Sequence, residues 1–173
     1  MRKLPYLLSA LGAALTAGAA ETAAPQRIID IRTDDISLIL SAAPGEEVRF
    51  LHFGGRIDDP APLAGYKSSR RADHGTDDLA YPAMGGRNFR EPALRVTHAD
   101  GDMNTELRYV SHSSRQLADP NVTETVVKMT DCCQALDVEL VFTAYARENV
   151  ITTHTVIRNR EQGRVTLHSF YSS

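Results

Sequence analysis

The residues best suited to bind a polar ligand lie in a loop between Tyr81 and Pro92. This loop carries Arg87, Asn88 and Arg90, whose side chains can donate several hydrogen bonds to hydroxyl groups or carboxylates. Glycines before these residues and a proline after them are typical of a loop, and binding residues often lie on loops carried by a β scaffold. The segment is therefore predicted to be a binding loop. It contains no recognisable catalytic constellation.

Two sets of residues resemble metal ligands. Asp100, Asp102 and Asn104 have the D-x-D-x-N spacing that begins a calcium loop, but the glycine and the bidentate glutamate that such a loop requires are missing. The segment is instead predicted to be a hairpin turn. His98 and His112 could meet across that hairpin, yet two histidines without a third ligand do not define a zinc site. We predict no metal site and no cofactor.

The two cysteines of the chain, Cys132 and Cys133, are adjacent. This arrangement excludes a disulfide-rich scaffold and the usual paired-cysteine zinc patterns. The pair could form a strained disulfide in an oxidising compartment, or it could remain two free thiols in a loop. The sequence leaves both alternatives open.

Length, charge and composition restrict the function classes. The 173 residues suffice for one domain with a core. A net charge of −3 and an isoelectric point near 6.1 give no basic surface, so we do not expect nucleic acid as a partner. The absence of tryptophan argues against a free-standing sugar-binding module, because sugar platforms usually use flat aromatic faces.

The N-terminus has the pattern of a secretory signal peptide over residues 1–20. Arg2 and Lys3 precede an apolar run from Leu4 to Ala17, and small residues follow at the expected cleavage position. The run is too short for a membrane-spanning helix, so we predict a secreted or periplasmic protein with no membrane contact. Residues 21–26 are predicted to be a linker.

From Arg27 onwards the sequence has β patterning, and residues 27–173 are predicted to form one domain. Alternating apolar and polar residues between Leu136 and Tyr145 indicate a strand with one buried face. Residues 93–98 and 105–111 are predicted to pair as a hairpin, and residues 58–79 to form a long loop containing at most one helical turn. The fold class is an all-β, antiparallel β-sandwich. The chain stops on a strand, so we expect an incomplete sandwich and a fragment of a longer protein. Further strands are expected over residues 28–31, 36–40, 48–53, 122–129, 150–157 and 165–171.

In several segments the sequence resembles bacterial α-galactosidases of glycoside hydrolase family 36. The similarity follows the order of the chain over nearly all of the expected mature protein. The matching segments include Leu51–Ile57, Tyr81–Leu94, Glu106–His112, Glu124–Val126, Leu140–Tyr145, Glu148–Ile151 and Ile157–Asn159.

The resemblance implies a fold and an activity. In that family this region begins an N-terminal β-supersandwich of the galactose-mutarotase-like type, which precedes a (β/α)₈ catalytic barrel. The family hydrolyses terminal α-galactosides such as melibiose and raffinose with retention of configuration. Its two catalytic aspartates lie in the barrel, so the resemblance implies no catalytic residue in this chain and no activity for the chain alone.

The resemblance also suggests a role for the Tyr81–Pro92 loop, because in the family it lies near the active site, in some members that of a neighbouring subunit. Arg87, Asn88 and Arg90 are therefore predicted to bind the α-galactoside substrate in a full-length homo-oligomer, together with the chain's own catalytic barrel. At Asn88 the family usually has an acidic residue, so this chain lacks a charged acceptor for a sugar hydroxyl at that position. The alternative is a stand-alone carbohydrate-binding or structural β-sandwich module.

Overall fold

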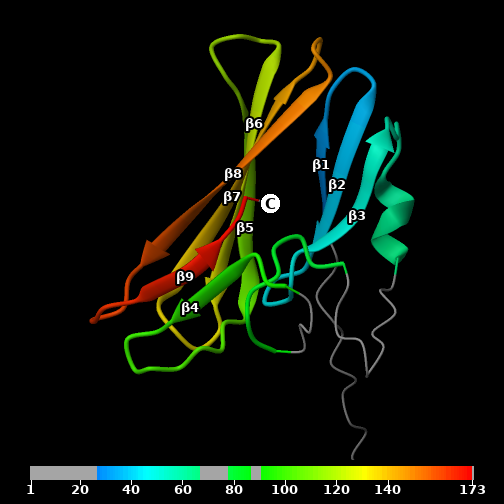
Figure 1. Ribbon diagram of the computed structural model, residues 1–173. Coiled ribbons are helices and arrows are strands. Elements are labelled where there is room, and N and C mark those ends of the chain that lie inside the picture. Colours follow the sequence, from blue (N-terminus) through cyan, green and yellow to red (C-terminus); the bar gives the residue numbers. More distant parts are fainter. Residues whose placement is uncertain (1–26, 67–77, 87–90, 173) are drawn as a thin grey trace, which may run out of the picture.

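The computed structural model describes residues 27–66, 78–86 and 91–172, and the regular secondary structure in these parts is almost entirely β-strand (Figure 1). The predicted signal peptide (1–20) and linker (21–26) lie outside the described residues. One turn of 3-10 helix, η1 (Ala61–Gly65), lies in the segment expected to form a long loop. The strands are β1 (Arg27–Arg32), β2 (Ile36–Ala42), β3 (Arg49–Gly55), β4 (Leu94–Thr97), β5 (Leu107–Gln116), β6 (Val122–Asp131), β7 (Leu136–Tyr145), β8 (Val150–Asn159) and β9 (Thr166–Phe170).

The strands form three antiparallel sheets, which confirms the predicted fold class. Strands β1, β2 and β3 form one meander, and β5, β6, β7 and β8 form a second, longer one. The third sheet pairs β4 with β9, and it lies across the lower half of the four-stranded sheet in Figure 1. Among the described residues, no helix is long and apolar enough to span a membrane.

The core lies between the sheets, and β7 contributes most to it. Its alternate residues, from Leu136 to Ala144, are at most 3% exposed, as the sequence pattern predicts. They pack in one cluster with residues of β1, such as Ile29, and of β4, such as Val96. Because side chains of all three sheets meet there, the architecture is a sandwich. Burying each large aliphatic side chain stabilises the fold by about 1.5–3 kcal/mol relative to leaving it exposed.

The predicted hairpin between residues 93–98 and 105–111 is wrong. The turn itself forms, because the His98 amide donates to the Asp102 carbonyl at 2.8 Å. Beyond it, however, β5 pairs with β6, and β4 pairs with β9, where Leu94 stands opposite Phe170. The Thr105 amide donates to the Met84 carbonyl at 2.9 Å, which directs the chain away from β4. Hydrogen bonds to a distant segment therefore override the local hairpin pattern.

Candidate functional site

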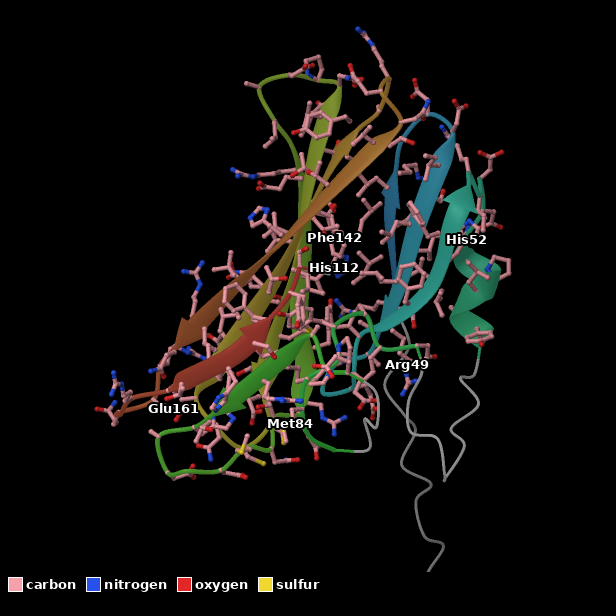
Figure 2. All side chains as sticks on the ribbon, viewed as in Figure 1. Arg49, His52, Met84, His112, Phe142 and Glu161 are labelled. Carbon is pink, nitrogen blue, oxygen red and sulfur yellow. The ribbon has the colours of Figure 1, made fainter. Side chains whose placement is uncertain are left out.

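The predicted binding loop is closed at its base by backbone hydrogen bonds. The Ala93 amide donates to the Pro82 carbonyl at 2.7 Å, and the Met84 amide donates to the Leu94 carbonyl at 2.8 Å. Tyr81 is only 4% exposed and packs in the core, so it holds the start of the loop. Met84 marks this base near the lower end of the molecule in Figure 2. The loop therefore leaves the sandwich from a fixed position.

The polar residues predicted to bind substrate, Arg87, Asn88 and Arg90, lie outside the described residues, as does Phe89. Their role stays a prediction. The described residues on either side are Gly86 and Glu91, and the carboxylate of Glu91 lies 3.9 Å from the Arg95 guanidinium. The Glu91 side chain is 73% exposed and that of Arg95 41% exposed, so this ion pair holds the loop only weakly.

Gly85 lies very close to the segment that precedes β5. A Cβ atom at this position would lie 2.6 Å from the Thr105 amide nitrogen and 2.7 Å from the Asn104 Oδ1 atom. The Gly85 φ angle of +149° also disfavours a residue with a side chain. The next residue is tied to the same segment, because the Gly86 amide donates to Asn104 Oδ1 at 2.9 Å. The loop base thus requires glycine.

A small cavity lies beside this base. Glu47, Val48, Leu79, Tyr81, Ala83, Gly85, Gly86, Thr105, Glu106, Leu107 and Met129 line it. Its volume of about 30 Å³ accommodates a water molecule. Pockets that bind small molecules are about 300–1,000 Å³ in volume, so a sugar ring does not fit here. The described part of the loop base is therefore a packing feature and not itself a sugar pocket.

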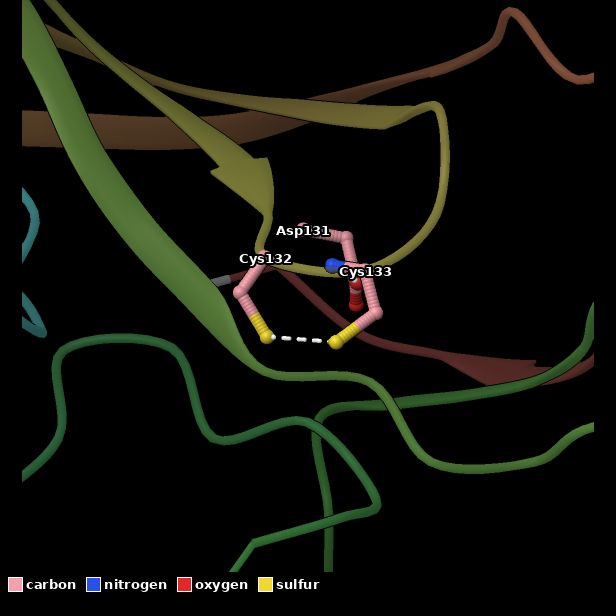
Figure 3. A group of neighbouring side chains, drawn as sticks. All are labelled: Asp131, Cys132 and Cys133. Carbon is pink, nitrogen blue, oxygen red and sulfur yellow. Dashed lines mark hydrogen bonds between the residues drawn. The ribbon is translucent and has the colours of Figure 1, made fainter.

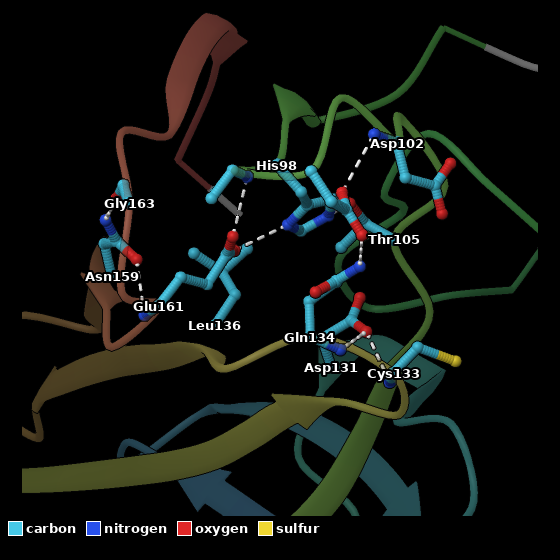
Figure 4. Close-up of polar contacts among 12 residues, drawn as sticks. His98, Asp102, Thr105, Asp131, Cys133, Gln134, Leu136, Asn159, Glu161 and Gly163 are labelled. Carbon is cyan, nitrogen blue, oxygen red and sulfur yellow. Dashed lines mark hydrogen bonds and ion pairs between the residues drawn. The ribbon is translucent and has the colours of Figure 1, made fainter.

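The carboxylate of Asp131 holds the segment around Glu106, which lies against the base of the loop. Its Oδ2 atom accepts from the Glu106 amide at 2.9 Å, and its Oδ1 atom accepts from the amides of Cys133 and Gln134 at 2.7 and 2.9 Å. In return, the Cys132 amide donates to the Glu106 carbonyl at 3.0 Å. Figure 4 shows Asp131 with Cys133 and Gln134. Together with the two bonds to Glu106, these contacts fix the turn between β6 and β7 against the segment that contacts Gly85 and Gly86.

The segment resembling a calcium loop is a hydrogen-bonded turn. The Asp102 amide donates to Asp100 Oδ1 at 3.0 Å, and the Gln134 side chain donates to Asp100 Oδ2 at 2.8 Å. These two bonds, the backbone one first, lower the pKa of Asp100. The Asn104 side-chain oxygen accepts from Gly86. The side-chain oxygens of Asp100 and Asn104 therefore accept hydrogen bonds from N–H groups, as a turn requires.

The two histidines do not form a joint site. His98 is buried, with Nδ1 2.7 Å from Glu161 Oε1 and Nε2 2.9 Å from the Thr105 hydroxyl (Figure 4). The other Glu161 oxygen accepts from the Ala99 amide at 2.8 Å. His112 instead has Nδ1 2.7 Å from the Tyr109 hydroxyl, and burial lowers its pKa. Because His98 has both ring nitrogens engaged, it braces the loop between β4 and β5 against the turn between β8 and β9.

Within the part of the chain that the structure describes, one group of three side chains could in principle hold a metal ion: Asp131, Cys132 and Cys133 (Figure 3). Their ligand atoms lie within 4.8 Å of one another. Both oxygens of Asp131 already accept hydrogen bonds from backbone amides. Only two sulfur atoms then remain, and zinc sites in proteins have at least three protein ligands. The arrangement does not fit a zinc centre.

The sequence did not reveal the residues that support this site through hydrogen bonds. Thr105, Asp131 and Glu161 are all central to it. Thr105 contacts His98, 7 residues earlier, whereas Asp131 and Glu161 accept from amides 25 and 62 residues away in the chain. Asp131 alone had a local signal, since an aspartate that accepts from amides two and three residues later is a common turn motif.

Comparison with known proteins gives a consistent result. The model of the glycosyl hydrolase family 36 N-terminal domain matches residues 46–173. Probable α-galactosidase G of Emericella nidulans is 25% identical over 151 residues, which cover 75% of this chain and 20% of that protein. α-Galactosidase AgaA of Geobacillus stearothermophilus is 31% identical over 100 residues, which cover 50% of this chain and 14% of that protein.

Solved structures share the fold. The crystal structure of AgaA from Geobacillus stearothermophilus superposes with a TM-score of 0.73 at 23% identity, and the match covers 84% of this chain and 24% of that one. The α-galactosidase of Lactobacillus brevis superposes with a TM-score of 0.72 at 22% identity, over 84% of this chain and 23% of that one. The chain thus spans at most about a quarter of the length of these relatives.

Proposed function

The chain belongs to the glycosyl hydrolase family 36 N-terminal domain family, and from this premise we propose that it is the non-catalytic N-terminal domain of an α-galactosidase. The enzyme hydrolyses terminal α-galactosides of the melibiose and raffinose type with retention of configuration. The domain shapes the substrate pocket and the homo-oligomer. The observation that carries this proposal is the family match over residues 46–173, which includes the whole Tyr81–Pro92 loop.

The proposed division of labour follows from the chemistry. A retaining glycosidase needs two carboxyl groups about 5 Å apart on either side of the scissile bond. The loops at the C-terminal face of a (β/α)₈ barrel can supply such a pair, so we place both groups in a barrel of the same protein. The part left to this chain is to bind and orient the sugar.

The Tyr81–Pro92 loop is suited to that part. Its base is fixed by the Pro82 and Leu94 hydrogen bonds and by the close contact at Gly85, so the residues beyond it start from a defined position. Arg87, Asn88 and Arg90 would supply hydrogen-bond donors to sugar hydroxyls. A loop base that is already fixed reduces the conformational entropy lost when substrate binds.

The alternative is a stand-alone carbohydrate-binding or structural module. One observation favours it: a hollow of about 340 Å³ on the outer face of the four-stranded sheet has the size of a ligand pocket. No aromatic residue lines it, which argues against a sugar platform. Its lining consists of Val110, Lys128, Met129, Thr130, Asp137, Glu139 and Arg160.

Export is a further part of the proposal. The pattern of residues 1–20 supports a signal peptide and hence a secreted or periplasmic enzyme. Intact mass of the protein recovered from an exporting host should lack roughly the first 20 residues. Recovery of a protein that retains Met1 or Arg2 would contradict this localisation.

The loop is tested in the continuous protein that contains this chain and a catalytic barrel. Arg90→Ala should lower kcat/KM for raffinose about tenfold, which corresponds to about 1.4 kcal/mol, and leave the melting temperature unchanged. Arg115→Ala is the matched control. Arg115 lies near the far end of β5, 71% exposed, and pairs with Glu124 on the surface. Equal kinetics for both variants would reduce the loop to a connector.

The alternative is tested on the chain alone. Under the main proposal the purified chain should release no galactose from an aryl α-galactoside and should not bind raffinose in calorimetry. Millimolar or tighter binding of raffinose that Glu139→Ala abolishes would favour a free-standing carbohydrate-binding module, because Glu139 lines the 340 Å³ hollow.

A further inference from the structure

The turn between β6 and β7 presents two thiols in close contact. The sulfur atoms of Cys132 and Cys133 lie 3.0 Å apart, and both residues are exposed (Figure 3). Neighbouring residues in an extended strand point to opposite faces of the sheet, so convergence of two adjacent side chains requires a particular backbone turn. That turn is held in place by the hydrogen bonds of the Asp131 carboxylate to the Cys133 and Gln134 amides.

The surroundings of the pair favour thiol chemistry over metal binding. The Asp131 carboxylate accepts three backbone hydrogen bonds and so is already engaged. The Cys132 amide donates to the Glu106 carbonyl, which fixes the other side of the turn. What the turn offers to solvent is therefore a pre-positioned dithiol whose two sulfur atoms can react with each other.

We propose that Cys132 and Cys133 are a reversible redox site that closes to a disulfide by exchange with a small-molecule disulfide. One cysteine thiolate attacks the small disulfide, forms a mixed disulfide and releases one small thiolate. The second cysteine loses its proton to solvent, attacks the protein sulfur of the mixed disulfide and releases the second small thiolate. The two cysteines lose two electrons, and the small disulfide gains them as it becomes two thiols.

Two features make this closure reversible. The Cα atoms of adjacent residues are about 3.8 Å apart across a trans peptide, which is less than the roughly 4.4–6.8 Å usual for disulfides, so the ring is strained. It is also exposed, and strained, exposed disulfides are the readily reduced ones. The hydrogen bond with the neighbouring Cys133 thiol and partial desolvation raise the pKa of Cys132 to about 11, so the Cys132 thiol is protonated at neutral pH and its exchange should accelerate in alkali.

The experiment uses the full chain, because its only cysteines are these two and any disulfide can be assigned without mapping. The reduced protein is equilibrated with mixtures of reduced and oxidised glutathione, quenched in acid and analysed by intact mass. We expect a monomer that has lost two hydrogen atoms. We also expect its proportion to be at least tenfold higher, relative to the dithiol form, than in the same chain unfolded in urea, because the native turn brings the sulfurs together.

Cys132→Ser and Cys133→Ser serve as controls and should yield only mixed disulfides with glutathione. Circular dichroism checks that each variant remains folded. The proposal is overturned if the native chain accumulates two glutathione adducts or disulfide-linked dimers, or if unfolding in urea increases the internal disulfide. A product that dithiothreitol does not return to the dithiol form would contradict its reversibility.

Discussion

The contact at the base of the Tyr81–Pro92 loop makes a quantitative prediction for Gly85→Ala. The added Cβ would lie 2.6 Å from the Thr105 amide nitrogen and 2.8 Å from the Thr105 carbonyl oxygen, and both are backbone atoms that cannot rotate away. Relieving such overpacking costs about 1–3 kcal/mol. Holding a residue with a side chain in a sparsely populated backbone region costs about 1–3 kcal/mol more. We therefore expect the free energy of unfolding to fall by about 2–6 kcal/mol.

Substitutions at two further glycines separate the steric cost from the backbone cost. Gly101 has a φ angle of +91° with open space around it, so Gly101→Ala should lose only the backbone contribution of about 1–3 kcal/mol. Gly55 has no neighbour within 4 Å of the added Cβ and no positive φ angle, so Gly55→Ala should change stability by less than about 0.5 kcal/mol.

Urea unfolding followed by circular dichroism measures all three variants. In Gly85→Ala, hydrogen exchange at the Thr105 amide should also accelerate, because its bond to the Met84 carbonyl opens. If Gly85→Ala is as stable as Gly101→Ala, the close approach at the loop base does not exist in solution. If Gly85→Ala is as stable as Gly55→Ala, the positive φ angle assigned to Gly85 is wrong as well.

Other predictions concern the core and the titrating groups. Leu140→Ala should cost about 2–5 kcal/mol, because Leu140 is fully buried, whereas Leu167→Ala should cost under about 0.5 kcal/mol, because Leu167 is 43% exposed; similar melting temperatures would refute the burial assignment. The folded-state pKa of Asp100 is lowered, so its contribution to stability is complete above the ordinary carboxyl pKa of about 3.9 and is lost as pH falls through the lower folded value. Asp100→Asn should thus destabilise the chain at pH 7, and the effect should shrink as pH falls below the ordinary carboxyl range. An effect that does not change with pH would contradict the hydrogen bonds to the Asp100 carboxylate. The hydrogen bond to the Cys133 thiol contributes most to the raised pKa of Cys132. In Cys133→Ala, the pH midpoint for alkylation of Cys132 should therefore fall below about 11, and an unchanged midpoint would exclude that contact.

The strands were predictable because their signal is local. From Leu136 to Tyr145 the alternation of apolar and polar residues determines both the strand and its buried face, and the structure agrees at each apolar position of the pattern. Strand pairing is different, because β4 could pair with the nearby β5 or with β9, about seventy residues later in the chain. The alternation of apolar residues in β4 is compatible with either partner, so the local sequence pattern could not determine which strand pairs with β4.

The site was predictable only in part for the same reason. Glycines and a proline marked the loop, and the structure shows why Gly85 is needed there. The bracing of His98 by Glu161 joins residues 63 positions apart, and it involves a buried histidine that composition alone cannot distinguish from a metal ligand. The Asp131 turn beneath the loop base had a recognisable local motif, which reasoning from the two cysteines alone overlooked.

Hydrolysis of raffinose by the continuous protein that contains this chain tests the central proposal most directly. The first galactose released, observed by proton NMR before it mutarotates, should be the α-anomer, because a retaining enzyme preserves the configuration of its substrate. A protein that releases the β-anomer would contradict retention. One that leaves both raffinose and aryl α-galactosides intact would contradict the assignment of this chain to an α-galactosidase.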